Sequence, residues 1–341
     1  MIRLLQAMAG APHGGAETFF VRLALAFERA GQDQRILIRR DSARAAALRV
    51  GGIAPIELPF HRWLDLSTLF GFRRAIRDYR PQIVLTWMTR ATQLCPSGEF
   101  VHVARLGGYY DLRHYRRCQH LIGNTQEICD YLVRSGWPAE RAHYLPNFVP
   151  EMRSPPVARA SLGTPEDVPL ILALGRLHEN KAFDVLLAAM AFVPRAHLWL
   201  AGEGPLRAAL ETKAAALDIA ERVHFLGWRE DTAALLAAAD MLACPSRQEP
   251  LGNVVIEAWS ASVPVVAAAS AGPAALIRDG ETGLLVPIDD SAALAAAIGR
   301  LAGDPALRNR LAEAGHAAYA AQFGETTVVA RYREFLERVA R

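Results

Sequence analysis

The chain has 341 residues, a hydrophobic fraction of 52% and a net charge of +3, which is enough for about two globular domains with ordinary cores. It contains no run of eighteen apolar residues, and its first residues lack the charged start and long apolar stretch of a signal peptide, so we expect neither a membrane-spanning helix nor secretion. The four cysteines form no Cys-x-x-Cys pair, which indicates reduced thiols in a cytoplasmic protein and argues against a zinc site.

The first half of the chain alternates short apolar runs with amphipathic segments. Its expected strands cover residues 2–7, 34–38, 82–87 and 119–124, and its expected helices cover 16–30, 69–79 and 125–135. Strands that alternate with helices in this way predict a parallel sheet covered on both faces.

The segment 146–169 is the best candidate for a linker, because proline and glycine recur in it. The alternation then resumes, with expected strands at 170–174, 198–201, 223–226, 241–244 and 263–268 and expected helices at 182–193, 291–301, 305–321 and 325–339. The sequence therefore predicts two doubly wound α/β domains. Such sheets bind ligands at the carboxyl ends of their strands, so we expect a site in a cleft between the domains.

Charge is divided unevenly between the two halves. Residues 1–165 carry 22 basic and 13 acidic side chains, and residues 166–341 carry 16 and 22. A basic first half suits an anionic membrane surface or a phosphorylated acceptor, although an ordinary solvated surface explains it equally well. Residues 69–80 form an amphipathic stretch that fits either anionic lipid or the face of the sheet. No basic–aromatic binding motif occurs, so we expect no nucleic-acid partner.

Two loops in the second half follow expected strands and contain cationic or glycine residues. In the first, Arg176 and Lys181 are suited to neutralising a diphosphate, although a surface loop paired with Glu179 is an alternative. In the second, Gly202 and Gly204 mark a tight turn into a helix, which is mainly structural and at most near a nucleotide.

The most informative segment runs from Glu249 to Glu257. Glu249 follows a turn, Glu257 lies in the first turns of an expected helix, and Gly252 between them allows a ligand to approach the backbone closely. A helix start can hold an anionic group while carboxylates accept hydrogen bonds from hydroxyls, and a nucleotide sugar has both groups. An acid near a helix start is otherwise simply a favourable partner of the helix dipole.

These loops suggest a common mechanism. Glu249 would hold sugar hydroxyls, Glu257 would accept hydrogen bonds from a ribose, and the amides near Val254 and Val255 would face phosphate. Arg176 and Lys181 would stabilise the leaving diphosphate electrostatically, which is often the largest catalytic contribution.

Four motifs follow one another along the chain: Gly14-Gly15-Ala16-Glu17, which His13 precedes; Gly175-Arg176-Leu177 with Lys181; Gly202-Glu203-Gly204-Pro205-Leu206; and Glu249 with Glu257. Together they resemble the retaining glycosyltransferases of family 4, the group 1 transferases, which have the GT-B fold. The resemblance covers essentially the whole chain and is strongest from about residue 170 to residue 290.

The resemblance implies two Rossmann-like domains. Residues 1–155 would bind the acceptor, residues 156–324 would bind the donor, and a C-terminal helix at about 325–341 would pack back on the first domain. It implies transfer from a nucleotide-diphosphate sugar of UDP type to a glycan or lipid-linked acceptor, with retention of configuration, in bacterial cell-surface polysaccharide or lipopolysaccharide biosynthesis. No metal or other cofactor is expected, and the protein would be cytoplasmic or peripheral on the inner face of the plasma membrane.

The resemblance also assigns site residues. Donor contacts are expected from Gly14, Gly15, Gly175, Gly202, Gly204, Leu251, Gly252, Asn253, Val254, Val255 and Glu257. The expected catalytic residues are Arg176, Lys181, Glu249 and Asp111.

Three positions depart from the family pattern. Ala182 replaces the usual glycine after the lysine, and Ala275 occupies the place of a frequent glutamate. The first-domain loop that often carries a histidine corresponds to residues 103–111, where Asp111 or a backbone carbonyl would take its place. Two alternatives to a transferase stay open: a GT-B enzyme of other chemistry, such as a nucleotide-sugar epimerase or sugar-phosphate synthase, and a non-catalytic nucleotide-sugar binding subunit.

Overall fold

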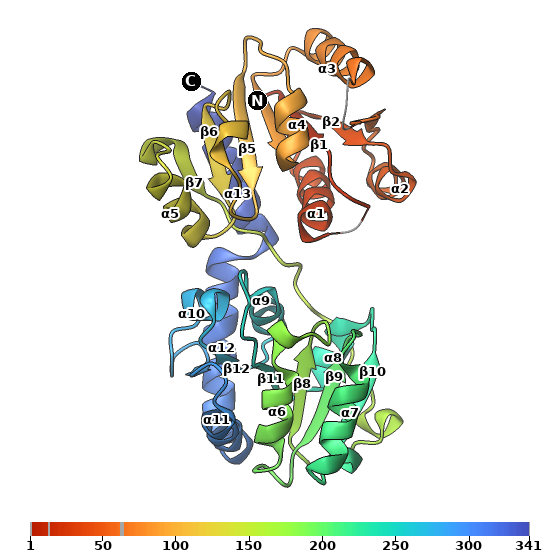
Figure 1. Cartoon of the computed structure of the whole chain (residues 1–341), viewed down its shortest axis with the longest axis vertical. Helices are drawn as coiled ribbons and strands as arrows, with labels where there is room; N and C mark the ends of the chain where they lie inside the picture. Colours follow the sequence, from red (N-terminus) through yellow and green to blue (C-terminus); the bar gives the residue numbers. More distant parts are fainter. Residues whose placement is uncertain (1, 13, 62–64, 341) are drawn as a thin grey trace. The chain divides into compact units, whose positions relative to one another are not determined.

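The computed structural model describes residues 2–12, 14–61 and 65–340, so His13 of the first glycine motif lies outside the described residues, as do Met1 and Arg341. The chain forms two compact units (Figure 1). Unit 1 comprises Met1–Phe148 and Glu325–Arg341, and unit 2 comprises Val149–Gly324. Most of the predicted linker packs on unit 2, where the Val149 N–H donates to the Phe323 carbonyl at 3.1 Å.

Unit 1 is built on a parallel sheet with strand order β3-β2-β1-β4-β5-β6-β7. Its strands are β1 (Leu4–Met8), β2 (Gln34–Arg39), β3 (Ile56–Leu58), β4 (Ile83–Trp87), β5 (Val101–Leu106), β6 (His120–Gly123) and β7 (Ala142–Tyr144). The order reverses between β1 and β4, which is the switch point of a doubly wound sheet.

The helices of unit 1 come from both ends of the chain. They are α1 (Gly15–Arg29), α2 (Ser42–Val50), α3 (Leu66–Tyr79), α4 (Met88–Leu94), α5 (Gln126–Arg134) and α13 (Glu325–Val339), with 3₁₀ turns η1 (Leu112–His114) and η2 (Ala139–Arg141). Figure 1 shows α13 among the elements of unit 1, where Val328, Tyr332 and Phe335 join the buried core.

Unit 2 repeats the architecture with strand order β10-β9-β8-β11-β12-β13. Its strands are β8 (Leu170–Leu174), β9 (His197–Ala201), β10 (Val223–Gly227), β11 (Met241–Cys244), β12 (Val265–Ala268) and β13 (Leu284–Val286). The helices are α6 (Phe183–Met190), α7 (Arg207–Ala216), α8 (Thr232–Ala238), α9 (Asn253–Ser260), α10 (Ala271–Leu276), α11 (Ser291–Gly303) and α12 (Pro305–Gln322), with 3₁₀ turns η3 (Arg159–Leu162), η4 (Glu179–Lys181) and η5 (Ala220–Arg222). Two doubly wound parallel sheets confirm the predicted fold class.

Local chemistry explains where these elements lie. Strands β1, β4 and β11 are buried along their whole length and are apolar except for Gln6 in β1 and Thr86 in β4, as expected of parallel strands covered on both faces. Asp41, Asp65 and Thr125 precede α2, α3 and α5, and each accepts a hydrogen bond from the amide three residues on, which satisfies a free N–H of the first turn. Over the described ranges, no helix has the length and apolar character needed to cross a membrane.

One part of the expected first-domain loop is a strand. Residues 103–106 belong to β5, which pairs with β4 and β6 in the middle of the sheet. The strand was not expected because His102 and Arg105 interrupt its apolar pattern, yet both side chains are buried. Only residues 107–111 of the expected loop lie beyond the strand.

Candidate functional site

The loop after β8 brings the predicted cations to the carboxyl end of the unit 2 sheet. Gly175 has φ 145°, and its N–H donates to the Ala201 carbonyl at 3.0 Å. A Cβ at Gly175 would lie 3.1 Å from Lys181 Cε, so Lys181 folds back over the start of its own loop. Arg176 is exposed at this edge.

The glycines after β9 allow two loops to interlock. A Cβ at Gly202 would lie 1.9 Å from the Gly175 carbonyl oxygen, and one at Gly204 would lie 2.3 Å from the Leu177 carbonyl oxygen. The Leu177 N–H also donates to the Glu203 carbonyl at 2.9 Å. Both glycines are therefore needed for the close approach of the two backbones.

The Glu249 carboxylate lies against Lys181. Lys181 Nζ donates to Glu249 Oε2, and the Gly252 N–H donates to Glu249 Oε1 at 3.4 Å. Lys181 and Glu249 are 68 positions apart in the sequence and mostly buried, so the fold makes one ion pair of two separately predicted residues.

Gly252 turns the chain into α9. It has the left-handed backbone that glycine favours, φ 68° and ψ 31°, immediately before Asn253. The Val255 N–H donates to the Gly252 carbonyl at 2.9 Å, so this amide is used within the first turn of the helix. Val255 itself is a buried core residue, whereas Leu251, Asn253 and Val254 are partly exposed.

A pocket of about 200 Å³ lies among these loops. It is lined by Leu174, Gly175, Arg176, Ala201, Gly202, Trp228, Arg229, Thr232, Val254 and Glu257. The structure thus brings five of the predicted residues to one pocket from three predicted motifs. The pocket is not lined by Gly204, Leu251, Gly252, Asn253 or Val255, which lie near its lining residues in the chain. The Lys181–Glu249 pair adjoins it at Gly175.

Sequence reasoning missed the aromatic wall of this pocket. Trp228 follows β10 directly and is 76% exposed, which is unusual for so large an apolar side chain. The neighbouring Arg229 is held by Asp231, with Nη2 2.6 Å from Oδ2. The signal was available, because a tryptophan after a strand-ending glycine is suited to contact a ligand.

A second missed residue, Arg247, ties the loop of Lys181 to its neighbours. Its guanidinium binds Asp184 at 2.8 and 3.0 Å, Asp289 at 2.6 Å and the Glu179 carbonyl at 2.9 Å. Partial burial would raise the pKa of Asp184, but the hydrogen bond from Arg247 holds that pKa below its ordinary value. Arg247 therefore fixes η4, which carries Lys181.

The first glycine motif lies in unit 1 at the start of α1. Glu17 is buried, and its Oε1 accepts the Ala11 N–H at 2.8 Å. A Cβ at Gly14 would lie 2.3 Å from Glu17 Oε2, whereas a Cβ at Gly15 would meet no described residue within 4 Å. A side chain at position 14 would therefore have to displace the buried Glu17 carboxylate, whereas one at position 15 would not.

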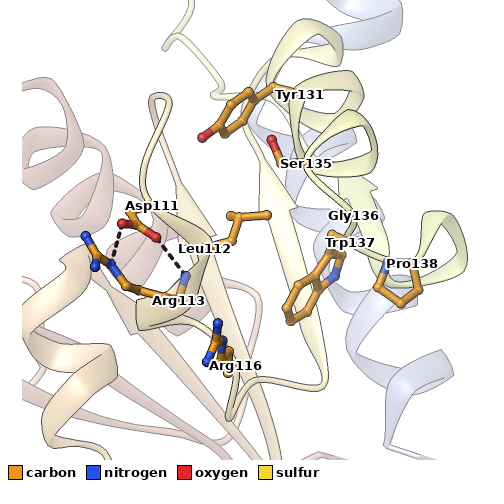
Figure 2. A pocket seen from close by; sticks show the side chains of 9 residues that line it. All are labelled: Asp111, Leu112, Arg113, Arg116, Tyr131, Ser135, Gly136, Trp137 and Pro138. Carbon is orange, nitrogen blue, oxygen red and sulfur yellow. Dashed lines mark hydrogen bonds and ion pairs between the residues drawn. The ribbon is translucent and has the colours of Figure 1, made fainter.

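Asp111 also belongs to unit 1 and is exposed beside η1. It accepts the Arg113 N–H at 3.0 Å and pairs with Arg113 Nε at 2.5 Å, and these hydrogen bonds lower its pKa. Figure 2 shows this pair at one side of a pocket of about 750 Å³, with Tyr131 and Trp137 at the other. Asp111 is therefore a surface residue bound to its neighbour.

Two histidines beside this region have structural partners. His102 is buried in β5 with Nε2 3.0 Å from Thr86 Oγ1, and His114 Nδ1 lies 2.8 Å from Gln93 Nε2. Within the described residues, no group of three or more His, Cys, Asp or Glu side chains is arranged to hold a metal ion.

Two family models match the chain. The model of glycosyl transferases group 1 matches residues 168–304, and that of glycosyltransferase family 4 matches residues 13–153. Two curated relatives from Rhizobium meliloti are similar over nearly the whole length. The lipopolysaccharide core biosynthesis glycosyltransferase LpsE is 37% identical, covering 95% of this chain and 96% of the relative, and LpsD is 34% identical, covering 95% of each.

A solved structure has the same fold. The Anabaena protein Alr3699/HepE, crystallised in complex with UDP, superposes with a TM-score of 0.86 and 21% identity, covering 99% of this chain and 100% of that one. The family models and the curated relatives confirm the predicted resemblance and transferase activity. On the strength of its full-length relatives and its two doubly wound sheets, this chain belongs to the group 1 glycosyltransferases, family 4.

Proposed function

We propose that the protein transfers a sugar from a nucleotide-diphosphate donor, with retention of configuration, to a glycan or lipid-linked acceptor in lipopolysaccharide core biosynthesis. The names of the two full-length relatives support the pathway. Unit 2 binds the donor, and unit 1 binds the acceptor.

The pocket at the carboxyl end of the unit 2 sheet supports a UDP-type donor. Arg176 supplies positive charge for the diphosphate, and Glu257 lies where a carboxylate can accept hydrogen bonds from ribose hydroxyls. The exposed indole of Trp228 offers a flat apolar surface for a pyrimidine base. UDP in the Anabaena structure of the same fold agrees with this choice of nucleotide.

The observation that carries the proposal is the Lys181–Glu249 pair beside this pocket. Glu249 holds the Lys181 ammonium in place, so the cation is fixed before the diphosphate leaves. Among the described residues, Glu249 Oε1 has one long contact, 3.4 Å from the Gly252 nitrogen, and can accept a hydrogen bond from a sugar hydroxyl. The cationic side chains of Arg176 and Lys181 compensate the negative charge of the leaving diphosphate, so the mechanism uses no metal ion.

Replacing either partner of this pair tests the proposal. We expect Lys181→Ala to lower kcat for sugar transfer roughly 10²–10³-fold, as the loss of a fixed electrostatic donor does. Glu249→Ala should also lose activity, because it leaves Lys181 without its partner. The matched control is Lys213→Ala, which removes the other lysine of the chain. Activity should survive a chelator, and unchanged transfer in both variants would overturn the catalytic assignment.

The surface of α3 supports a peripheral position on the inner face of the plasma membrane. Leu66 and Phe70 are 61% and 64% exposed, and Arg73, Arg74 and Arg77 are exposed on the following turns. Apolar side chains beside cations suit an anionic lipid surface.

Vesicle sedimentation tests this part. We expect binding to vesicles containing phosphatidylglycerol, loss of binding in 0.5 M salt or so because screening weakens surface charge, and weaker binding of the Leu66→Ser/Phe70→Ser variant. Val50→Ser, which changes an exposed apolar residue on α2, is the control. Equal binding to neutral phosphatidylcholine vesicles would contradict the role of charge.

A further inference from the structure

Arg105 is a buried cation without an acidic partner. It lies at the end of β5 and is only 4% exposed. Its guanidinium carbon lies 4.8 Å from the ring centre of Phe19 and 4.7 Å from that of Trp87. Nε donates to the Tyr332 hydroxyl at 3.2 Å, and Nη2 donates to Asn147 Oδ1. No Asp or Glu among the described residues forms an ion pair with it.

This arrangement leaves a charge incompletely compensated. Moving a cation out of water is unfavourable unless it is paired and hydrogen-bonded. Aromatic faces and neutral oxygens offset part of that free energy, but they supply no counter-charge. An anion that reached Nη1 would complete the set, because Nη1 donates to no other described residue.

A second buried polar group, like Arg105 Nη1, lies close to Gly107. Asn124 follows β6, the strand next to β5, and is 6% exposed. Its Oδ1 is buried and has no hydrogen-bond partner within the part of the chain that the structure describes. A Cβ at Gly107 would lie 3.7 Å from Asn124 Nδ2, 3.9 Å from Asn124 Oδ1 and 4.0 Å from Arg105 Nη1.

Gly107 is exposed, so the space at its Cβ position, within 4.0 Å of polar atoms of both Arg105 and Asn124, is open to solvent. Nη1 and Nδ2 are donors for an oxyanion, and neither is among the buried side-chain atoms that lack a hydrogen-bond partner. A phosphate or carboxylate at this point would meet both donors, and the saccharide acceptor of a sugar transferase can carry either group.

We propose that Arg105, Asn124 and the space over Gly107 bind the acidic group, a phosphate or a carboxylate, of a saccharide acceptor. The inference rests on the proposed transferase function and narrows its acceptor to acidic sugars. Arg105 and Asn124 are binding residues, and the basic excess of the first half of the chain draws such an acceptor to unit 1.

Gly107→Ala is the first test, because it fills the space without disturbing its neighbours. Every contact of the new methyl is at ordinary van der Waals distance, and Gly107 does not have a left-handed backbone. Gly108→Ala is the matched control, since its methyl would meet the Tyr110 ring at 3.6 Å instead. The readout is the ¹⁵N-indole resonance of Trp87, whose ring lies against Arg105, assigned with Trp87→Phe.

Titrations of the whole protein use glucose 6-phosphate, glucuronate, glucose and inorganic phosphate. We expect the two acidic sugars to shift the Trp87 resonance and glucose to leave it unchanged. Gly107→Ala should weaken this binding at least tenfold, and Gly108→Ala should preserve it. No shift with either acid, equal shifts with glucose, or an unaffected Gly107→Ala variant would each overturn the proposal. Inorganic phosphate binding as tightly as glucose 6-phosphate would overturn its saccharide part.

Asn124→Asp gives an independent test with the opposite sign. A carboxylate at position 124 would supply the missing counter-charge, so we expect a melting temperature raised by a few degrees together with at least tenfold weaker binding of glucose 6-phosphate. A purely structural asparagine would predict a lower melting temperature, and that result would contradict the proposal.

A transfer assay separates this inference from the proposed function. If acidic sugars shift the Trp87 resonance but no nucleotide sugar is consumed, the result supports the proposed binding site and contradicts the transferase proposal. If a neutral acceptor is glycosylated equally by the native protein and by Gly107→Ala, the result supports the transferase function and contradicts the proposal of an acidic acceptor.

Discussion

Ala182 follows Lys181 and has a left-handed backbone, with φ 52° and ψ 37°. Glycine is usual at this position in the resembled family, and the backbone explains why, since glycine adopts this conformation without the clash of a Cβ. The chain therefore holds its lysine loop with a strained residue that is fully buried.

Ala182→Gly should raise the free energy of unfolding by roughly 0.5–1 kcal/mol. Relief of a left-handed alanine contributes about 1–2 kcal/mol, and the greater freedom of glycine in the unfolded chain offsets about half of it. Urea unfolding measures the change. The control, Ala188→Gly within α6, should lower the free energy of unfolding by about 1 kcal/mol. A loss of stability in both variants would contradict the proposal that Ala182 is strained.

Among the elements, α13 has the most consequential packing, because it is the last helix of the chain and belongs to the first unit. Its apolar face places Val328, Tyr332 and Phe335 in the core that also contains α1, and its Tyr332 hydroxyl accepts from Arg105. The amphipathic spacing of apolar residues predicted the helix and its limits, 325–339. It does not indicate which of the two sheets the helix covers.

Phe335→Ala should therefore destabilise unit 1 by about 3–5 kcal/mol, the usual loss for a buried phenylalanine. Urea unfolding followed by tryptophan fluorescence, with Trp87 reporting on unit 1 and Trp199 and Trp259 on unit 2, should show an earlier transition for unit 1 alone. Phe192→Ala, an exposed residue of unit 2, should shift neither transition by more than about 0.5 kcal/mol. An equal shift of both unfolding transitions in Phe335→Ala would argue against the packing of α13 on unit 1 alone.

At the scale of the whole molecule, histidines in both units are held in their neutral form. Burial lowers the pKa of His102 and of His143 to about 4, and burial also lowers the pKa values of His120, His197 and His224. These groups bind protons more readily in the unfolded chain than in the folded one. Their contribution to the free energy of unfolding is therefore fully present above the pKa of histidine in the unfolded chain, about 6.5. It is lost as the pH falls from about 6.5 toward 4.

The free energy of unfolding should therefore fall between pH 7 and pH 5, with His102 alone contributing on the order of 1–2 kcal/mol. Urea titrations at several pH values test this. His102→Gln should flatten the dependence for unit 1, whereas His61→Gln, at an exposed position, should leave it unchanged. A stability that rises on acidification would contradict the neutral histidines.

The sequence by itself determined the strands with unbroken apolar runs, such as β8 and β11, the limits of α13, and the loops that carry Arg176, Lys181 and Glu249. These features depend on periodicity and residue type within a short stretch of chain. It did not determine β5, because a buried arginine and a buried histidine obey no apolar alternation.

Only the tertiary structure decided which distant residues meet. Lys181 pairs with Glu249, Arg247 joins Asp184 to Asp289, and Arg105 lies over the rings of Phe19 and Trp87. The physical reason is that partners far apart in sequence leave no local pattern. Their energies depend on burial and distance, and only the folded sheets, with their strand ends side by side, fix both.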